Sequence, residues 1–120
     1  MPFNWIEYLE LAKSLQTQQG KIYSQEAAFR SAVSRVYYAA FCYARHFARD
    51  FEGFIPRNNV QDHALVKIHF MNQGRPYIAR KLDALRKWRN ACDYNDIVDD
   101  LSELLIDALQ KAQEVIEKLR

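Results

Sequence analysis

The chain has 120 residues, which is the length of a single domain. Its composition is 49% hydrophobic and 27% charged, with only three Gly and three Pro, and this argues against a disordered chain and against a turn-rich all-β fold. A net charge of +2 does not by itself indicate a nucleic-acid-binding protein, and no apolar run approaches the roughly 20 residues of a membrane span.

The first two predicted helices cover residues 4–17 and 24–50. The second is the longer one, and its apolar residues recur at three- and four-residue steps, which is the pattern of a wide buried stripe. Alanines on this helix would let a neighbouring helix approach closely. The stripe consists of Phe29, Val33, Val36, Tyr37, Ala40, Phe41, Ala44 and Phe47.

Turn-forming residues at 51–61 predict a loop, and three further helices are predicted over 62–73, 76–92 and 96–119. The apolar face of the last helix begins at Ile97. Five helices joined by mostly short connections predict an all-α antiparallel up-and-down bundle of four to five helices, which forms one domain over the whole chain. The candidate N-caps are Asn4, Ser24, Asp62, and either Asn95 or Asp96.

Charge is unevenly distributed around the fourth predicted helix. Residues 75–89 carry six bases against one acid, Asp83, whereas residues 93–107 carry six acids and no base. Such blocks arise from solvated helix faces or from neighbouring helices that attract each other. The alternative is a local basic surface that binds an anionic partner.

The two cysteines, Cys42 and Cys92, belong to no CxxC pair, so a structural zinc site has no support and both are expected to be small buried residues. The first ten residues lack the features of a signal peptide. We therefore expect a cytoplasmic protein in a reducing compartment, without a membrane, cofactor or metal.

Arg89 breaks the pattern of the fourth predicted helix. At 100° per residue it falls in the middle of the apolar stripe that Ile78, Leu82 and Leu85 form. Because a guanidinium keeps its charge, burying it unpaired is costly, and Asp93 at i+4 is the obvious partner. One interpretation is a structural ion pair. The other is an arginine that meets a phosphate in a cleft, where it can form two parallel hydrogen bonds.

Two segments of the chain resemble a known family. Residues 35–41, RVYYAAF, are similar to the R-x-YYA-x-F signature of small prokaryotic HEPN-domain proteins, and residues 85–94, LRKWRNACDY, are similar to the L-x-x-x-R-N-x-x-D-Y segment of that family. His63, after a polar loop, matches a histidine often seen there. The resemblance covers about residues 24–105.

The resemblance implies a HEPN-like helical bundle that is usually a homodimer. Many HEPN proteins are metal-independent ribonucleases, and several act as toxins beside a small nucleotidyltransferase. Their motif is R-x(4–6)-H, in which the arginine stabilises the scissile phosphate and the histidine assists proton transfer. Here Arg89 and Asn90 match the arginine and the polar residue after it, whereas Asp93 and Tyr94 stand where the histidine would follow. A literal R-x(5)-H occurs elsewhere, from Arg57 to His63.

The sequence leaves three functions open. The first is a HEPN-type RNA- or nucleotide-binding protein that acts as the toxin-like partner of a nucleotidyltransferase antitoxin. The second is a metal-independent endoribonuclease in which Asp93, Tyr94 or His63 replaces the missing histidine. The third is a non-catalytic helical interaction module. The candidate phosphate-binding residues are Arg89, Asn90, Arg35, His63 and Arg86, and the candidate catalytic residues are Arg89, Asp93 and Tyr94.

Overall fold

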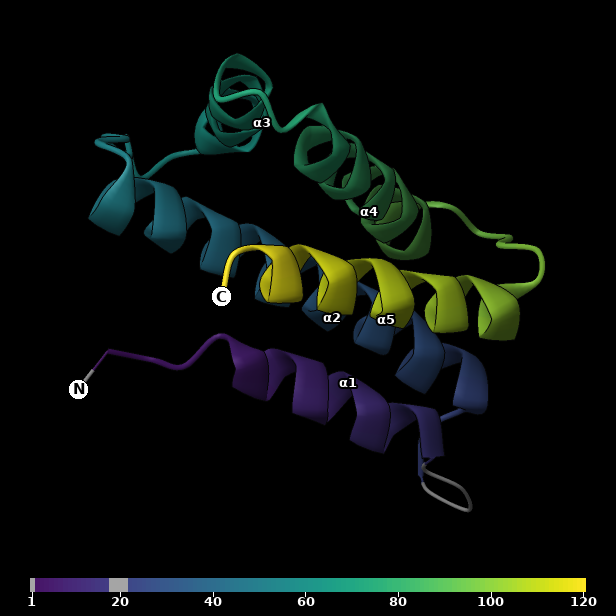
Figure 1. Ribbon diagram of the computed structural model, residues 1–120. Coiled ribbons are helices and arrows are strands. Elements are labelled where there is room, and N and C mark those ends of the chain that lie inside the picture. The colour runs from purple at the N-terminus through teal and green to yellow at the C-terminus, as the bar shows by residue number, and fades with distance from the viewer. Residues whose placement is uncertain (1, 18–21) are drawn as a thin grey trace.

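The computed structural model describes residues 2–17 and 22–120. Four helices lie side by side and alternate in direction, and the short third helix lies across the end where the second finishes and the fourth begins (Figure 1). The predicted all-α antiparallel bundle is therefore confirmed. The helices are α1 (Ile6–Thr17), α2 (Gln25–Phe51), α3 (Asp62–Asn72), α4 (Pro76–Tyr94) and α5 (Leu101–Lys118).

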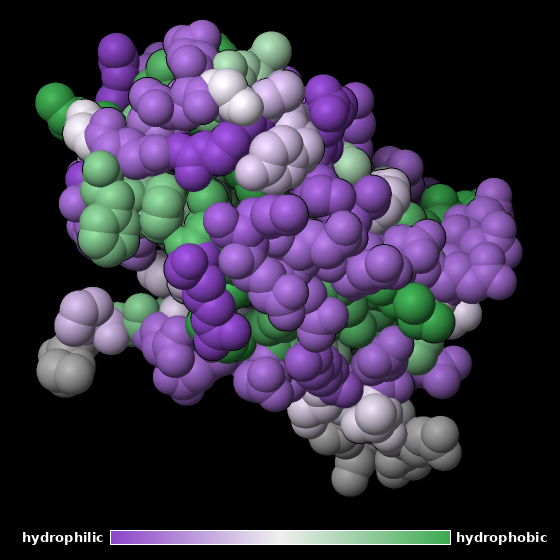
Figure 2. Space-filling view, in the orientation of Figure 1, coloured by the Kyte–Doolittle hydropathy of each residue, from purple (hydrophilic) through white to green (hydrophobic). Residues whose placement is uncertain are grey.

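The long helix α2 is the centre of the bundle and packs against each of the other four helices. Its predicted stripe is confirmed, since residues such as Val33 and Val36 are fully buried and only Phe47 is half-buried. Buried alanines such as Ala40 and Ala44 add little bulk, so the neighbouring helices approach closely. Hydrophilic side chains cover most of the face seen in Figure 2, and apolar atoms appear between the helices.

Local chemistry sets the first two helix starts as predicted. The Asn4 side chain accepts a hydrogen bond from the backbone N–H of Ile6 at 3.2 Å, and the Ser24 hydroxyl accepts one from Ala27 at 3.0 Å. Both bonds satisfy N–H groups that have no partner inside the helix. Cys42 and Cys92 are free and buried, which confirms that prediction. Across the described ranges, no helix combines the length and the apolar character needed to cross a bilayer.

The last helix begins at Leu101, so the prediction of a helix from residue 96 is wrong. Neither Asn95 nor Asp96 is its N-cap, because both lie in the connection that follows α4. Ile97, placed in the core by the sequence pattern, is 79% exposed.

Arg30 on α2 explains this difference. Its guanidinium donates hydrogen bonds to the backbone carbonyls of Cys92, Asn95 and Asp96 at 2.6 to 3.0 Å. Carbonyls at the end of α4 thereby find a long-range partner, and the chain turns away before α5 starts. Asp100 then adopts a left-handed backbone conformation, with φ of 52°, immediately before the new helix.

Asp62 is not a helix cap, which corrects another prediction. The N-cap of α3 is Gln61, and Asp62 is the first helical residue and only 1% exposed. Its carboxylate accepts hydrogen bonds from the backbone N–H groups of Arg57 at 2.9 Å and Asn58 at 3.0 Å, and it pairs with Arg45 at 3.4 Å. Asp62 therefore fastens the α2–α3 loop to α2.

Candidate functional site

Arg89 is accommodated between an aspartate and two tyrosine rings. Its side chain is 13% exposed, its Nε donates to Asp93 at 3.1 Å, and its Nη1 donates to the Tyr38 hydroxyl at 2.9 Å. The guanidinium carbon lies 5.3 Å from the centre of the Tyr38 ring and 5.7 Å from that of Tyr37, within the range of cation–π attraction. The predicted i, i+4 ion pair is therefore present, but it is one of several contacts.

His63, near the start of α3, reaches the same pair of tyrosines. Its ring stacks on Phe41 with centres 4.4 Å apart and an interplanar angle of 20°. Its Nδ1 is hydrogen-bonded to the hydroxyl of Tyr37, the residue over whose ring Arg89 lies. The fold thus brings Arg89 and His63 to the same pair of tyrosines, although they stand 26 positions apart in the sequence.

The surroundings keep His63 neutral at physiological pH. Burial, followed by the positive charges of Arg86, Arg89 and Arg45, lowers the pKa of His63 to about 4. Burial raises the pKa of Tyr37, so its hydroxyl stays protonated. Because the Tyr37 hydroxyl carries a proton and has Nδ1 of His63 as its partner, we assign Tyr37 as the donor of this hydrogen bond. The single proton of the neutral His63 ring is then on Nε2. In this state His63 offers a hydrogen-bond donor at Nε2 and has no free lone pair.

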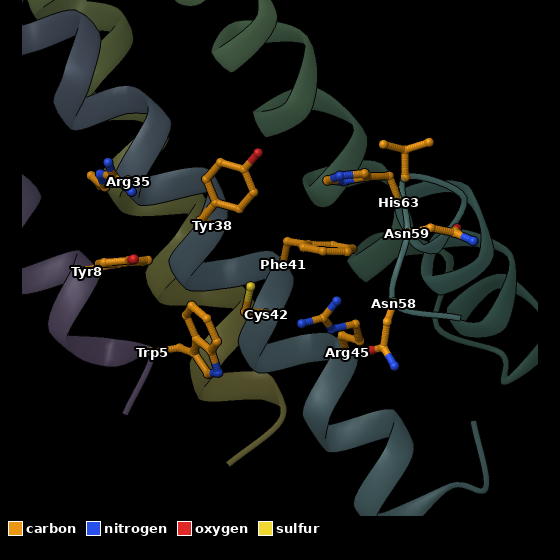
Figure 3. Close-up of a pocket in the computed structure, with 11 residues that line it drawn as sticks. Trp5, Tyr8, Arg35, Tyr38, Phe41, Cys42, Arg45, Asn58, Asn59 and His63 are labelled. Carbon is orange, nitrogen blue, oxygen red and sulfur yellow. The ribbon is translucent and has the colours of Figure 1, made fainter. Parts of the chain in front are cut away.

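A pocket of about 600 Å³ opens beside this cluster, between the α1 region, α2 and the α2–α3 loop (Figure 3). Five aromatic or imidazole rings and two guanidinium groups contribute to its wall. Two of the predicted site residues line it, and Arg89 contacts its wall through Tyr38. The lining residues are Trp5, Tyr8, Arg35, Tyr38, Phe41, Cys42, Arg45, Asn58, Asn59, Val60 and His63.

Arg45 is a pocket residue that the sequence analysis missed. Its Nη1 contacts Asp62 at 3.4 Å, and its guanidinium carbon lies 5.5 Å from the centre of the Phe41 ring. Its Nε is buried and has no hydrogen-bond partner among the described residues. The signal was available, because Tyr38, Phe41 and Arg45 follow one another at i, i+3 and i+7 on a single helix face.

Arg35 stands at the opposite edge of the pocket. It is exposed, and its guanidinium carbon lies 5.1 Å from the centre of the Tyr8 ring. Arg35 also lines a second, more polar pocket of about 410 Å³, together with Arg30 and Asp93. It therefore connects the aromatic pocket with the Arg89–Asp93 pair.

Other predicted residues lie outside the aromatic pocket. Tyr94 is 75% exposed, Asn90 is half-buried, and neither lines that pocket. Arg86 is close enough to depress the pKa of His63. Arg57, the start of the literal R-x(5)-H pattern, donates to Gln61 at 3.3 Å and is not part of the pocket wall. Within residues 2–17 and 22–120, no group of three His, Cys, Asp or Glu side chains is placed to hold a metal ion.

Comparison with known proteins gives no relative: no family model, no curated protein and no solved structure matches this chain. The HEPN resemblance therefore stays a prediction carried by the two motifs. These motifs meet in space, since Arg89 of the second motif lies over Tyr37 and Tyr38 of the first. The function is accordingly inferred from the chemistry of this meeting point.

Proposed function

We propose that this protein binds RNA or a nucleotide in a HEPN-like manner, with Arg89 and the arginines around it holding phosphate. The observation that carries the proposal is the gathering of guanidinium groups on aromatic rings beside an open pocket. Guanidinium groups bind phosphate through paired, charge-assisted hydrogen bonds, and aromatic faces stack on bases. The arginines that lie on rings are Arg35, Arg45 and Arg89, and Arg86 adds positive charge close to His63.

The protonation of the site favours binding over proton transfer. Arg89 commits its Nε and one Nη1 hydrogen to protein partners, which leaves Nη2 for an anion. His63 presents an N–H donor at Nε2, because Tyr37 occupies Nδ1. Both groups thus supply donors to a phosphate oxygen.

Fluorescence anisotropy with a labelled single-stranded RNA tests this function. Arg89→Lys keeps the positive charge but loses the planar guanidinium group, which can form paired hydrogen bonds to a phosphate. We expect its affinity for RNA to fall about tenfold, because the loss of one charge-assisted hydrogen bond costs about 1.4 kcal/mol. Arg80→Lys is the matched control, since Arg80 is exposed and lies nine residues, or about 180°, from Arg89 on the same helix. Equal losses in both variants, or no RNA binding by the wild type, would contradict the proposal.

A metal-independent ribonuclease is the second candidate, favoured by the link from Arg89 through Tyr37 to His63. A general base needs a free lone pair, so cleavage requires the His63 proton to leave Nε2 first. The test is cleavage of RNA in EDTA by the wild type, Arg89→Ala and His63→Gln. Loss of cleavage in both variants, with unchanged helical content, supports an enzyme. RNA that is bound but left intact by all three proteins supports the binding function.

The partner assignments remain predictions of the resemblance. A homodimer and a nucleotidyltransferase antitoxin partner are both proposed on the motifs alone. Sedimentation of the purified protein tests the first, and co-purification with a nucleotidyltransferase encoded beside it tests the second. The third candidate, a purely structural Arg89–Asp93 pair in an interaction module, makes a different prediction for Asp93 variants, which is given below.

A further inference from the structure

We propose that the pocket between the α1 region, α2 and the α2–α3 loop takes one unpaired nucleotide, with its phosphate on Arg45 and its base against the aromatic wall. The inference rests on the proposed RNA- or nucleotide-binding function and assigns it a second contact point, distinct from Arg89. It also makes the preferred nucleic acid single-stranded.

The phosphate position follows from the incomplete bonding of Arg45. Its Nε is buried without a hydrogen-bond partner among the described residues, and its contact with Asp62 is long, at 3.4 Å. Nε itself is too deeply buried to meet a ligand, but the Arg45 side chain is 20% exposed and lines the pocket, so a phosphate oxygen can bond to the terminal guanidinium nitrogen that Asp62 does not contact. Asp62 holds the arginine in place from the other side and is itself fixed by two backbone N–H groups. The guanidinium is therefore positioned before any ligand arrives.

The charge around the pocket favours an anion. Arg35 and Arg45 line it, and the pKa of His63 is depressed in part by three nearby arginines. The nearest carboxylate to Arg45, that of Asp62, is 1% exposed and already accepts two backbone hydrogen bonds. A phosphate entering the pocket thus meets positive potential and no exposed carboxylate on the wall.

The base position follows from the rings. Figure 3 shows Tyr38, Phe41 and His63 along one side of the pocket and Trp5 and Tyr8 on the other. A volume of about 600 Å³ lies within the roughly 300–1,000 Å³ typical of small-molecule sites, which is enough for a single nucleotide. Aromatic and imidazole faces of this kind stack on any base.

The same geometry excludes a paired base. In a duplex each base is stacked between its neighbours and hydrogen-bonded to its partner, so it enters a side pocket only after it has been extruded, which is costly. A single strand or a free nucleotide does not bear that cost. Both sources share the required chemistry of one phosphate and one accessible base.

Trp5 provides a direct reporter of the pocket. The chain has two tryptophans, and Trp88 lies elsewhere, against Lys111. In a Trp88→Phe background, a base stacked in the pocket is expected to quench the fluorescence of Trp5. The titrants are a single-stranded RNA, the same sequence in a duplex, a nucleoside monophosphate and inorganic phosphate.

We expect quenching by the single strand and at least about tenfold weaker binding of the duplex. Arg45→Lys keeps a positive charge near Asp62 but removes the terminal guanidinium nitrogens that would hold the phosphate, so the affinity is expected to fall about tenfold. Arg49→Lys is the matched control, because Arg49 lies one turn further along α2, also pairs with an aspartate and is outside this pocket. Quenching by the monophosphate would identify a free nucleotide as ligand, whereas quenching by RNA alone would identify a strand; either result supports the pocket.

Two results overturn the inference. One is equal affinity for single strand and duplex, and the other is an Arg45→Lys protein that binds and quenches like the wild type. If RNA binding is lost in Arg89→Lys while Arg45→Lys is unaffected, the proposed function stands and the pocket assignment fails. If the wild type binds no RNA and no nucleotide, the proposed function itself fails.

Discussion

At the scale of single residues, Arg89 shows how a permanent charge is held on an apolar helix stripe. Asp93 neutralises it from the solvent side, and the rings of Tyr37 and Tyr38 attract it from the core side. The Asp93 carboxylate competes for the same guanidinium that a phosphate would use. Its removal therefore separates a structural role of the pair from a binding role.

Asp93→Asn is expected to tighten RNA binding several-fold and to change the melting temperature little. The carboxylate of Asp93 is about one third exposed, so loss of its charge costs little stability, while Arg89 keeps its bond to Tyr38. Anisotropy titration and thermal denaturation measure the two effects. A lower melting temperature with unchanged RNA affinity would favour the structural interpretation, and loss of RNA cleavage with intact binding would make Asp93 catalytic.

His63 carries the second prediction at this scale. Burial disfavours the charged ring and nearby arginines oppose the added charge, so the pKa of His63 is lowered to about 4. The unfolded chain takes up this proton near the ordinary pKa of about 6.5. The unfolded state thus binds more protons between these two values, and the stability contributed by neutral His63 is present above pH 6.5 and falls as the pH drops toward 4.

An NMR titration of the His63 ring protons checks this pKa directly. We expect a midpoint near pH 4, well below that of an unperturbed histidine. Thermal denaturation of His63→Gln should show a weaker loss of stability between pH 6.5 and 4 than the wild type shows. A midpoint at or above 6.5 would mean that the ring is more accessible to water than its packing against Phe41 indicates.

At the scale of elements, local signals predict helices well, and contacts between distant segments decide the connections. The Ser24 cap is predictable because its hydrogen-bond partner is only three residues away. The Arg89–Asp93 pair is predictable because its two members lie one helical turn apart. The start of α5 was mispredicted because Arg30, more than 60 residues earlier, binds the carbonyls that end α4. Periodicity contains no information about such a partner.

In the candidate site too, residues that belong to local motifs were predicted, and residues brought in by distant segments were missed. The motifs drew attention to Tyr37, Tyr38 and Arg89, all of which lie at the meeting of α2 and α4. Trp5 was missed because the pocket forms only where the start of α1 packs on α2. Asp62 looks like a cap in sequence, and its bond to Arg45 appears only once the loop is folded back on α2.

The Arg30 contact gives a prediction at the element scale. In Arg30→Lys, one ammonium group cannot reach all three carbonyls. We therefore expect the free energy of unfolding to fall by about 1–3 kcal/mol. Amide exchange should accelerate mainly in residues 93–100, where the connection from α4 to α5 runs. Arg49→Lys serves as the control for the same chemical change at an exposed site. Uniform acceleration over the whole chain would show instead that Arg30 supports the core.

At the scale of the whole molecule, one continuous core joins all five helices. The buried hydrophobic residues of α1, α3, α4 and α5 all belong to the cluster built around α2. The site depends on this arrangement, because its side chains come from the start of α1, from α2, α3 and α4 and from the loop before α3. A local opening of α1 would separate Arg35 from Tyr8, and one of α4 would separate Arg89 from Tyr37 and Tyr38.

A single core predicts cooperative unfolding, and Leu105→Ala tests it. Leu105 is fully buried on α5, so its truncation is expected to cost about 2–5 kcal/mol and to lower the melting temperature by roughly 10 °C. Ile106→Ala next to it is the control, since Ile106 is 54% exposed and its loss should matter little. Both variants are made in the Trp88→Phe background, where circular dichroism follows all helices and the emission of Trp5 alone follows the packing of α1 on α2. The two melting curves should shift together in Leu105→Ala; an α1 signal that stays at the wild-type temperature would mean that the pocket wall folds independently of the remaining bundle.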